Sequence, residues 1–173
     1  LPSDRFNRIA NGKDYLPFPG WKKNGSAILV VTPSDKPCLF YGIDRNKWVE
    51  KTLQILKENT DRPIVIRDKG LRRERIGRNS IYHQLEDDNI FAVVTYNSIA
   101  ATEAIGFGIP AFTLAPNAAD KFCKKDLTEI ESPLYSDPEK VIKWQYWLGY
   151  CQYTPDEMSD GTAMKLIKEY DLK

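Results

Sequence analysis

The sequence predicts an α/β protein with a doubly wound parallel sheet and a helical C-terminal tail. Short runs of apolar or β-branched residues alternate along the chain with stretches of helical character. The runs are apolar throughout instead of alternating with polar residues, which is typical of strands covered on both faces. A length of 173 residues is enough for one domain with a sizeable core. Strands that alternate with helices favour parallel pairing through right-handed crossovers.

The first half of the chain contains two expected strands. The first is expected at residues 27–32, AILVVT, and a loop with two prolines should follow at residues 33–42. Asp44 is a suitable cap for a helix that runs to about Asn59 and carries its apolar residues on one face. The second strand is expected at residues 64–67. A basic loop at residues 71–79 and a short helix at residues 80–85 should follow, the loop containing Arg72, Arg73, Arg75 and Arg78.

Residues 91–117 form the central segment of the prediction. Residues 91–95 suit a strand buried on both faces, and Asn97 or Ser98 can cap the helix expected at residues 99–107. Gly108 stands where a left-handed residue usually ends a helix, and Pro110 prevents the helix from resuming. Residues 111–114 are the next strand. The segment therefore predicts a βαβ unit with parallel strands.

The C-terminal part is predicted to be helical. A short helix is expected at residues 118–125 and an irregular segment at residues 127–134. Asp137 followed by Pro138 indicates a helix start, and that helix should run to Tyr150. Thr154 to Glu157 is a capping box that opens a last helix to about Tyr170, weakened in its middle by Gly161.

Composition excludes several classes of protein. The net charge of +1 gives no global case for nucleic acid or an anionic membrane as a partner. Three scattered cysteines, no C-x-x-C pair and one histidine argue against a disulfide framework or a zinc site. We therefore expect no metal, no cofactor, and a reducing, cytoplasmic location. No apolar run approaches the roughly 18 residues of a membrane span, and we expect no signal peptide.

Polar residues gather where the predicted strands end. Ligands of open α/β sheets bind beyond the carboxyl ends of the strands, and helix N-termini there favour anions. Two cations and one helix start at these ends suit a phosphate or diphosphate. The candidate binding residues are Arg67, Lys69, Thr95, Asn97, Ser98, Glu103 and Asn117. Simple capping by Ser98 and solvation of the basic loop are the alternative interpretations.

No motif identifies a catalytic residue. G-x-G-x-x-G, a Walker loop and G-x-S-x-G are all absent from the sequence. His83 is a weak catalytic candidate only, since a packed or solvated histidine explains it equally well. The catalytic group is otherwise unknown.

Residues 103–110 read E-A-x-x-x-G-x-P and resemble the nucleotide-sugar segment in the C-terminal domain of GT-B glycosyltransferases. The preceding V-V-T-x-N-S of residues 93–98 resembles the version found in capsule-polysaccharide transferases and related bacterial and phage proteins. The resemblance implies a Rossmann-like domain in which Glu103 holds the ribose and the strand end at Arg67 and Lys69 contacts the diphosphate. It implies a transferase that moves a sugar from a nucleotide sugar to a glycan or another acceptor.

The resemblance also implies an N-terminal domain that is missing from this chain. Since the chain begins at Leu1 and not at Met, we expect residues 1–24 to be a linker from a missing N-terminal domain and residues 25–173 to be the nucleotide-sugar domain. The partners are then the sugar donor and that N-terminal domain, where inverting enzymes of this type commonly carry the base. Retaining members have a second Glu eight residues before the ribose Glu, and this chain has Thr95 there. A non-catalytic nucleotide-binding or assembly module, a sugar-nucleotide 2-epimerase-like protein and a nucleic-acid-binding protein stay open as alternatives.

Overall fold

The structure, a computed structural model, describes residues 1–10, 17–68 and 80–172. Lys69 and the expected basic loop at residues 71–79 therefore lie outside the described residues. The chain forms two compact units. One consists of Pro19–Ser136, and the other combines Leu1–Phe18 with Asp137–Lys173. The division of residues 1–24 from residues 25–173 into a linker and a donor domain concerns function and stays a prediction.

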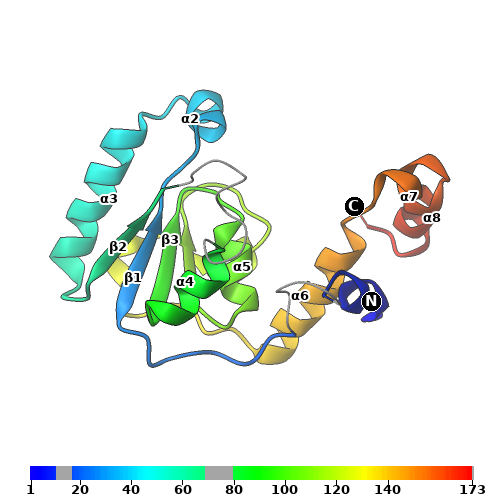
Figure 1. Ribbon diagram of the computed structural model, residues 1–173, viewed down its shortest axis with the longest axis horizontal. Coiled ribbons are helices and arrows are strands. Elements are labelled where there is room, and N and C mark those ends of the chain that lie inside the picture. The colour runs from blue at the N-terminus through cyan, green and yellow to red at the C-terminus, as the bar shows by residue number, and fades with distance from the viewer. Residues whose placement is uncertain (11–16, 69–79, 173) are drawn as a thin grey trace. The chain divides into compact units, whose positions relative to one another are not determined.

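The unit formed by Pro19–Ser136 is built on a five-stranded parallel sheet in the order β2-β1-β3-β4-β5 (Figure 1). Its strands are β1 (Ala27–Val31), β2 (Ile64–Arg67), β3 (Ile90–Thr95), β4 (Ala111–Thr113) and β5 (Cys123–Lys124). β3 pairs with β1 on one side and with β4 on the other. All pairs are parallel, which confirms the predicted fold class and the four predicted strands.

The fifth strand replaces a predicted helix. Residues 118–125 contain only one 3₁₀ turn, η3 (Asp120–Phe122), and β5 follows it at once. Cys123 pairs with Ala111 of β4 and is buried. The helix prediction was wrong because a two-residue strand is too short to give a periodic pattern.

Helices cover both faces of the sheet. α3 (Arg45–Asn59) and the 3₁₀ turn η4 (Leu127–Glu129) pack together over one face. α4 (Ile81–Asp87) and α5 (Ala100–Gly106) lie together on the other side (Figure 1). The core on the α3 face contains Ile28, Val30, Leu56, Phe91, Ala92, Val94, Phe112, Leu127 and Ile130. This double covering explains why β1 and β3 are buried along their whole length.

The helix ends follow the sequence signals closely. Asp44 caps α3, since its side chain accepts from the Lys47 amide at 3.0 Å. Gly108 has a φ of +87°, as predicted for the residue that ends α5. A side chain at this position would also meet the carbonyl oxygen of Gly20 at 2.2 Å. Gly108 therefore serves both the turn and a close backbone approach.

Residues 33–42 differ from the prediction. The expected loop contains a helix, α2 (Asp35–Tyr41), which ends at Gly42 with a φ of 64°. Pro37 lies in the first turn, where its missing N–H has no helical acceptor to lose. None of the helix is buried, so the sequence carries no apolar face that would have indicated it. Leu39 and Phe40 are 88% and 82% exposed.

The second unit is helical. It consists of α1 (Asp4–Ala10), α6 (Pro138–Tyr150), α7 (Pro155–Ser159) and α8 (Thr162–Glu169). The predicted cap of α6 and the predicted capping box of α7 are both confirmed. The prediction of a single last helix was wrong, because Gly161 adopts a φ of +84° and separates α7 from α8. No helix in the described part of the chain has the length and apolarity that a membrane crossing requires.

A buried arginine joins the ends of this unit. Arg5 of α1 is 5% exposed and forms an ion pair with Glu157 of α7 at 2.8 Å. Arg8 adds a second ion pair to the same carboxylate at 2.7 Å. The hydrogen bonds from Arg5, together with those from the Thr154 amide and Arg8, hold the pKa of Glu157 well below its usual value.

We predict that the stability of this helical unit depends on acid pH through Glu157. A carboxyl group whose pKa is lowered by folding stabilises the protein fully above its ordinary pKa, near 4.5, and loses that contribution as the pH falls. The free energy of unfolding should therefore fall progressively as the pH drops below about 5. Glu157→Gln should cost about 3 kcal/mol near neutrality, because it leaves Arg5 buried without its counter-charge.

Chemical denaturation of the wild type and of Glu157→Gln, followed by near-UV circular dichroism, measures both effects. Glu139→Gln is the matched control, since Glu139 is 80% exposed at its side chain. Equal pH dependence in the wild type and Glu157→Gln would contradict this account of the ion pair.

Candidate functional site

The strand order defines where a ligand fits best. The chain leaves β1 toward β2 and leaves β3 toward β4, which lie on opposite sides of the β1–β3 pair. Open α/β sheets bind ligands beyond the carboxyl ends of the two strands at such a reversal. Here those ends are Val31 and Thr95, which are direct partners in the sheet. The candidate site is therefore centred on the residues that follow them.

The ends of β1 and β2 are tied together by a buried hydroxyl group. Thr32 is 2% exposed, and its Oγ1 donates to Oδ1 of Asp68 at 2.8 Å. Its amide donates to the carbonyl oxygen of Arg67. Asp68 is thereby fixed beside the strand-order reversal. Asp68 is not among the candidate binding residues predicted from the sequence.

Arg67 is half-buried and lies close to α4. One of its terminal nitrogens donates to Oε1 of Gln84 at 2.7 Å. A guanidinium has five N–H donors, so an arginine can serve more than one acceptor. The structure thus brings Arg67 to the carboxyl edge and orients it from one side. Lys69, its predicted companion, cannot be placed in the same way because it lies outside the described residues.

The turn after β3 uses its own side chains to satisfy its backbone. Thr95 is fully buried, and its Oγ1 accepts from the Ser98 amide at 3.2 Å. The Ser98 hydroxyl group accepts from the Ala100 amide at 3.3 Å, and its carbonyl accepts from the Ala101 amide. Ile99, and not Asn97 or Ser98, occupies the cap position of α5 and makes no side-chain cap bond. The predicted capping by either residue was wrong in position, although Ser98 does accept a backbone N–H two residues ahead.

Asn117 holds this turn from the end of β4. Its Nδ2 donates to the Ser98 carbonyl at 2.8 Å, and its Oδ1 accepts from the Ala119 amide at 2.9 Å. The Thr102 hydroxyl group donates to the same Oδ1 at 3.3 Å. The side chain therefore links the turn, α5 and the loop after β4. This arrangement gives Asn117 a positioning role, whereas the sequence suggested direct ligand contact.

Glu103 lies in the first turn of α5, on an otherwise buried helix. Its neighbours Ala100, Ala101, Thr102, Ala104 and Ile105 are all buried, whereas Glu103 itself is half-buried. Only a narrow strip of the α5 surface is exposed, and the Glu103 carboxylate lies in that strip. Asn97 is also half-buried, in the turn that leads into the helix. Both residues thus stay near the carboxyl edge, as the sequence predicted.

Aromatic side chains form a part of this edge that the sequence analysis missed. The ring of Tyr96 contacts Tyr41 of α2 with a centroid distance of 5.3 Å and Trp48 of α3 with 6.3 Å, both edge to face. The Nε1 of Trp48 is buried without a hydrogen-bond partner among the described residues. The contact with Tyr41 depends on α2, which the sequence analysis took for a loop.

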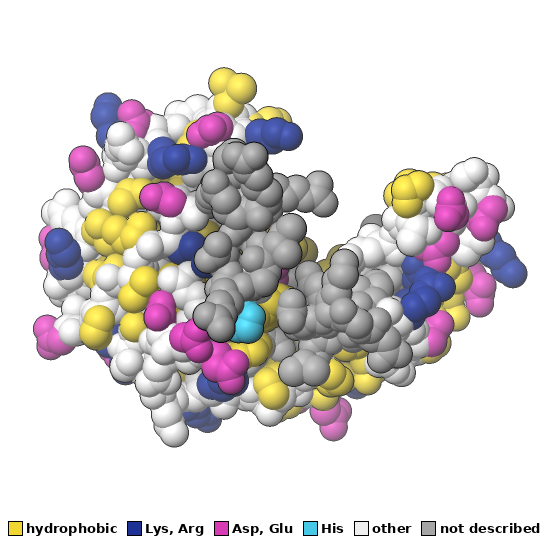
Figure 2. All heavy atoms as spheres, viewed as in Figure 1, with side chains coloured by type: hydrophobic (Ala, Val, Ile, Leu, Met, Phe, Trp, Pro, Cys, Tyr) yellow, Lys and Arg dark blue, Asp and Glu magenta, His cyan; other side chains and the backbone are white. Residues whose placement is uncertain are grey.

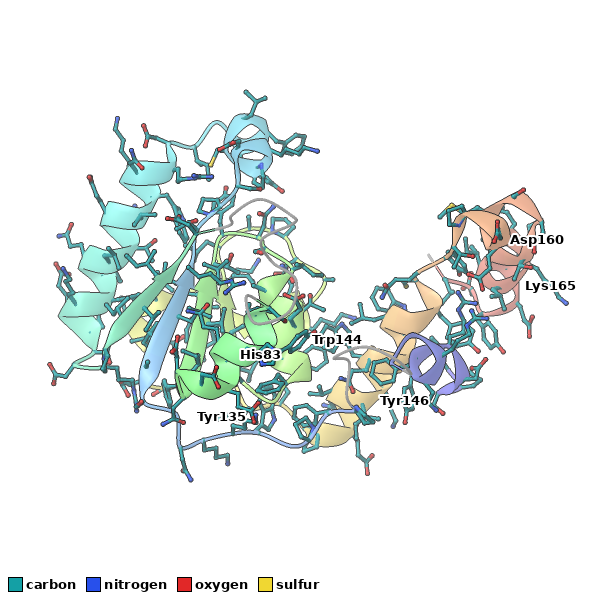
Figure 3. All side chains as sticks on the ribbon, in the orientation of Figure 1. His83, Tyr135, Trp144, Tyr146, Asp160 and Lys165 are labelled. Atoms are coloured by element: carbon teal, nitrogen blue, oxygen red, sulfur yellow. The ribbon has the colours of Figure 1, made fainter. Side chains whose placement is uncertain are left out.

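His83 stands apart from these interactions. It lies exposed on α4 (Figures 2 and 3). The hydrogen bonds described at the carboxyl edge are made by other side chains. Its weak candidacy as a catalytic residue gains no support from this placement.

The hollows that can be described lie at the opposite edge of the sheet. One open depression of about 790 Å³ is lined by residues 57–63, together with Gly25, Ser26 and Glu131. A second, of about 360 Å³, is lined by residues 21–25 and by Leu85, Glu86, Asn89 and Ile90. Both include residues that precede a strand, whereas ligands of parallel sheets bind where strands end. Strand direction therefore favours the carboxyl edge of the sheet, and not either depression, as the ligand site.

The larger depression contains a charged cluster with a structural explanation. Arg62 donates from its Nε to both carboxylate oxygens of Glu131, at 2.9 and 3.0 Å, and from another nitrogen to the Gly25 carbonyl. Its guanidinium also lies 3.6 Å from the centroid of the Phe91 ring. These contacts fasten the segment before β1 and the loop after η4 to the turn before β2. Arg62 is thus an anchor for three segments of the sheet unit.

Neither metal-binding side chains nor comparisons with known proteins help to locate the site. In residues 1–10, 17–68 and 80–172, no three His, Cys, Asp or Glu side chains are grouped so that they could hold a metal ion. Comparisons with protein-family models, with curated proteins and with solved structures found no match to this chain. The GT-B resemblance therefore stays a prediction from the sequence.

We predict that Asn117→Ala loosens the turn after β3. The substitution removes the bond to the Ala119 amide and one of the two bonds to the Ser98 carbonyl, which keeps the Ala101 amide, at a cost of about 1–3 kcal/mol in the free energy of unfolding. Amide hydrogen exchange at residues 98–102 should become faster in the variant. Asn46→Ala on the exposed side of α3 is the matched control and should change neither quantity. Unchanged exchange in Asn117→Ala would show that the turn is held by other contacts.

Proposed function

We propose that this chain is the nucleotide-sugar-binding domain of a GT-B glycosyltransferase of the capsule-polysaccharide or phage-associated type. It would bind the donor from which a sugar is transferred to a glycan or another acceptor. One observation carries the proposal. The E-A-x-x-x-G-x-P segment forms α5, its left-handed end at Gly108 and the start of β4, and this unit follows directly on the carboxyl end of β3 at the strand-order reversal.

The residues at this edge suit the chemistry of a nucleoside diphosphate. In the proposal, Arg67 pairs with diphosphate oxygens, and Lys69 follows it in the sequence as a second cation. Glu103 accepts hydrogen bonds from ribose hydroxyl groups, for which a carboxylate has several lone pairs. The ring faces of Tyr96 and Tyr41 add apolar surface beside the same turn.

The turn itself must change its bonds when the donor binds. The Ala100 amide already donates to the Ser98 hydroxyl group at 3.3 Å, a long bond between neutral groups. A phosphate oxygen is a stronger acceptor because it is charged. The hydroxyl group can then rotate and donate to the phosphate, so that one exchange gives two bonds to the ligand. The Thr95 bond to the Ser98 amide and the Asn117 bond to the Ser98 carbonyl keep the backbone in place during this exchange.

We propose that this chain binds the donor and that a partner domain supplies the catalytic base. Thr95 stands where retaining transferases carry a second Glu, and here it is fully buried and bonded to the turn. A threonine in this role cannot transfer protons to a substrate. The same observation favours a non-catalytic nucleotide-binding module as the second candidate. Three free cysteines, Cys38, Cys123 and Cys151, agree with the cytoplasmic location that belongs to the proposal.

Calorimetric titration with UDP, GDP, CDP and CMP tests the assignment. Helix-end dipoles contribute about 0.3–1 kcal/mol and charge-assisted bonds about 1.5–3 kcal/mol each, which together support micromolar to millimolar dissociation constants. We expect at least one nucleotide to bind, and Arg67→Ala to weaken it by about tenfold or more. Glu103→Ala should weaken UDP, GDP and CDP similarly if the ribose contact is correct.

Lys51→Ala is the matched control, because Lys51 is exposed on α3 and should leave binding unchanged. If none of the four nucleotides binds, or if both Arg67→Ala and Glu103→Ala bind as the wild type does, the donor site is wrong. Binding without any sugar transfer when a candidate acceptor is added would favour the non-catalytic module.

A further inference from the structure

Helix α1 contacts α6 and α7 through the side chains of Asp4, Arg5 and Phe6. The Nε of Arg5 donates to the Gly149 carbonyl at 3.2 Å, and a terminal nitrogen donates to the Gln152 carbonyl at 2.6 Å. Gly149 belongs to the last turn of α6, where carbonyls have no acceptor role within the helix and carry partial negative charge. The C-terminal end of α6 is therefore a receptor for a cation.

The start of α7 completes this receptor. Glu157 takes two bonds from Arg5, at 2.8 and 3.1 Å, and its position is fixed by the capping box with Thr154. The rings of Tyr150 and Tyr153 lie 5.7 and 5.0 Å from the guanidinium carbon. A planar, bidentate fork between aromatic rings selects arginine over lysine. Every group that surrounds Arg5 here comes from residues 149–157.

The residues on both sides of Arg5 are recognised as well. Asp4 accepts from the Tyr150 hydroxyl group at 2.8 Å. Phe6 is 5% exposed, and its ring lies 6.1 Å from that of Tyr146, which Figure 3 shows on α6. Gly149 permits the approach, because a side chain there would meet the Phe6 amide nitrogen at 2.8 Å. The surface of α6 and α7 thus contacts three consecutive side chains of α1, those of Asp4, Arg5 and Phe6.

We propose that this surface of α6 and α7 is a docking site for a short helical peptide that carries Asp-Arg-Phe, and that α1 fills it as a separable ligand. An isolated helix of seven residues is not stable in water, so α1 owes its order to the docking. The recognition resembles a helix laid into a groove, with Arg5 and Phe6 as anchors. The same site would accept the segment in trans, from an added peptide. This inference does not depend on the donor site.

Peptide rescue tests the proposal directly. The full chain with both Arg5→Ala and Phe6→Ala lacks the two anchors of α1, and a synthetic peptide of residues 1–10, LPSDRFNRIA, is titrated into it. We expect the thermal midpoint of the variant to rise with peptide concentration, by mass action. The peptide with its own Arg5→Ala should bind about tenfold more weakly or worse. The peptide with Asn7→Ala is the matched control and should rescue as well as the wild type, since Asn7 is exposed.

A folded chain with Arg5→Ala and Phe6→Ala whose thermal midpoint does not change with peptide at millimolar concentration would overturn the proposal. If this variant does not fold, the wild-type chain with a protease recognition sequence in place of residues 11–16 is cut after folding. Residues 1–10 should then stay bound and exchange with fluorescently labelled peptide. Loss of the segment without rebinding, or a segment that never exchanges, would show that α1 is an integral part of the fold and no ligand.

Discussion

The burial of β3 on both faces is the constraint on which the sheet unit depends. All six residues of this strand are buried, and it forms hydrogen bonds with β1 and β4 at its two sides. Such a strand can hold a polar side chain only where that side chain has a hydrogen-bond partner, as Thr95 at its end has in the Ser98 amide. The chain therefore becomes polar only at the end, where Thr95, Asn97 and Ser98 must satisfy the backbone of a tight turn. The chemistry of the carboxyl edge follows from the apolar character of the strand before it.

The second unit, which combines residues 1–18 with residues 137–173, contains a buried charged side chain. Arg5 is buried as deeply as many core residues, and it is tolerated because helix-end carbonyls and Glu157 surround it. Breaking such a pair costs far more than the pair itself contributes, since one charge remains buried alone. Asn117 and Arg5 thus act alike in their own units. Each is a polar side chain that bonds to the backbone of a segment distant in the sequence and so fixes the geometry of that segment.

Sequence patterns predicted those elements whose own residues carry a strong signal. Uniform apolar runs indicated β1 to β4, and caps at Asp44, Asp137 and Thr154 indicated three helix starts. β5 was missed because two residues are too few to show a periodic pattern. α2 was missed because none of its residues is fully buried, so its sequence shows no apolar face. Glu103 and Ser98 were placed near the edge correctly, whereas the bonds made by Asn117 and Arg5 join residues up to 152 positions apart. No local pattern encodes contacts of that kind, since they arise only when the fold brings the segments together.

The central claim is that a nucleotide binds at the carboxyl edge of the sheet, and amide chemical-shift mapping tests it most directly. Titration of the ¹⁵N-labelled chain with UDP and GDP should shift the amide signals of residues 95–103 and 114–119, which surround the end of β3. Signals of residues 57–63 and 21–25, which line the two depressions at the other edge, should stay unchanged. Shifts confined to residues 57–63 or 21–25, with none near Ser98 and Glu103, would contradict the account.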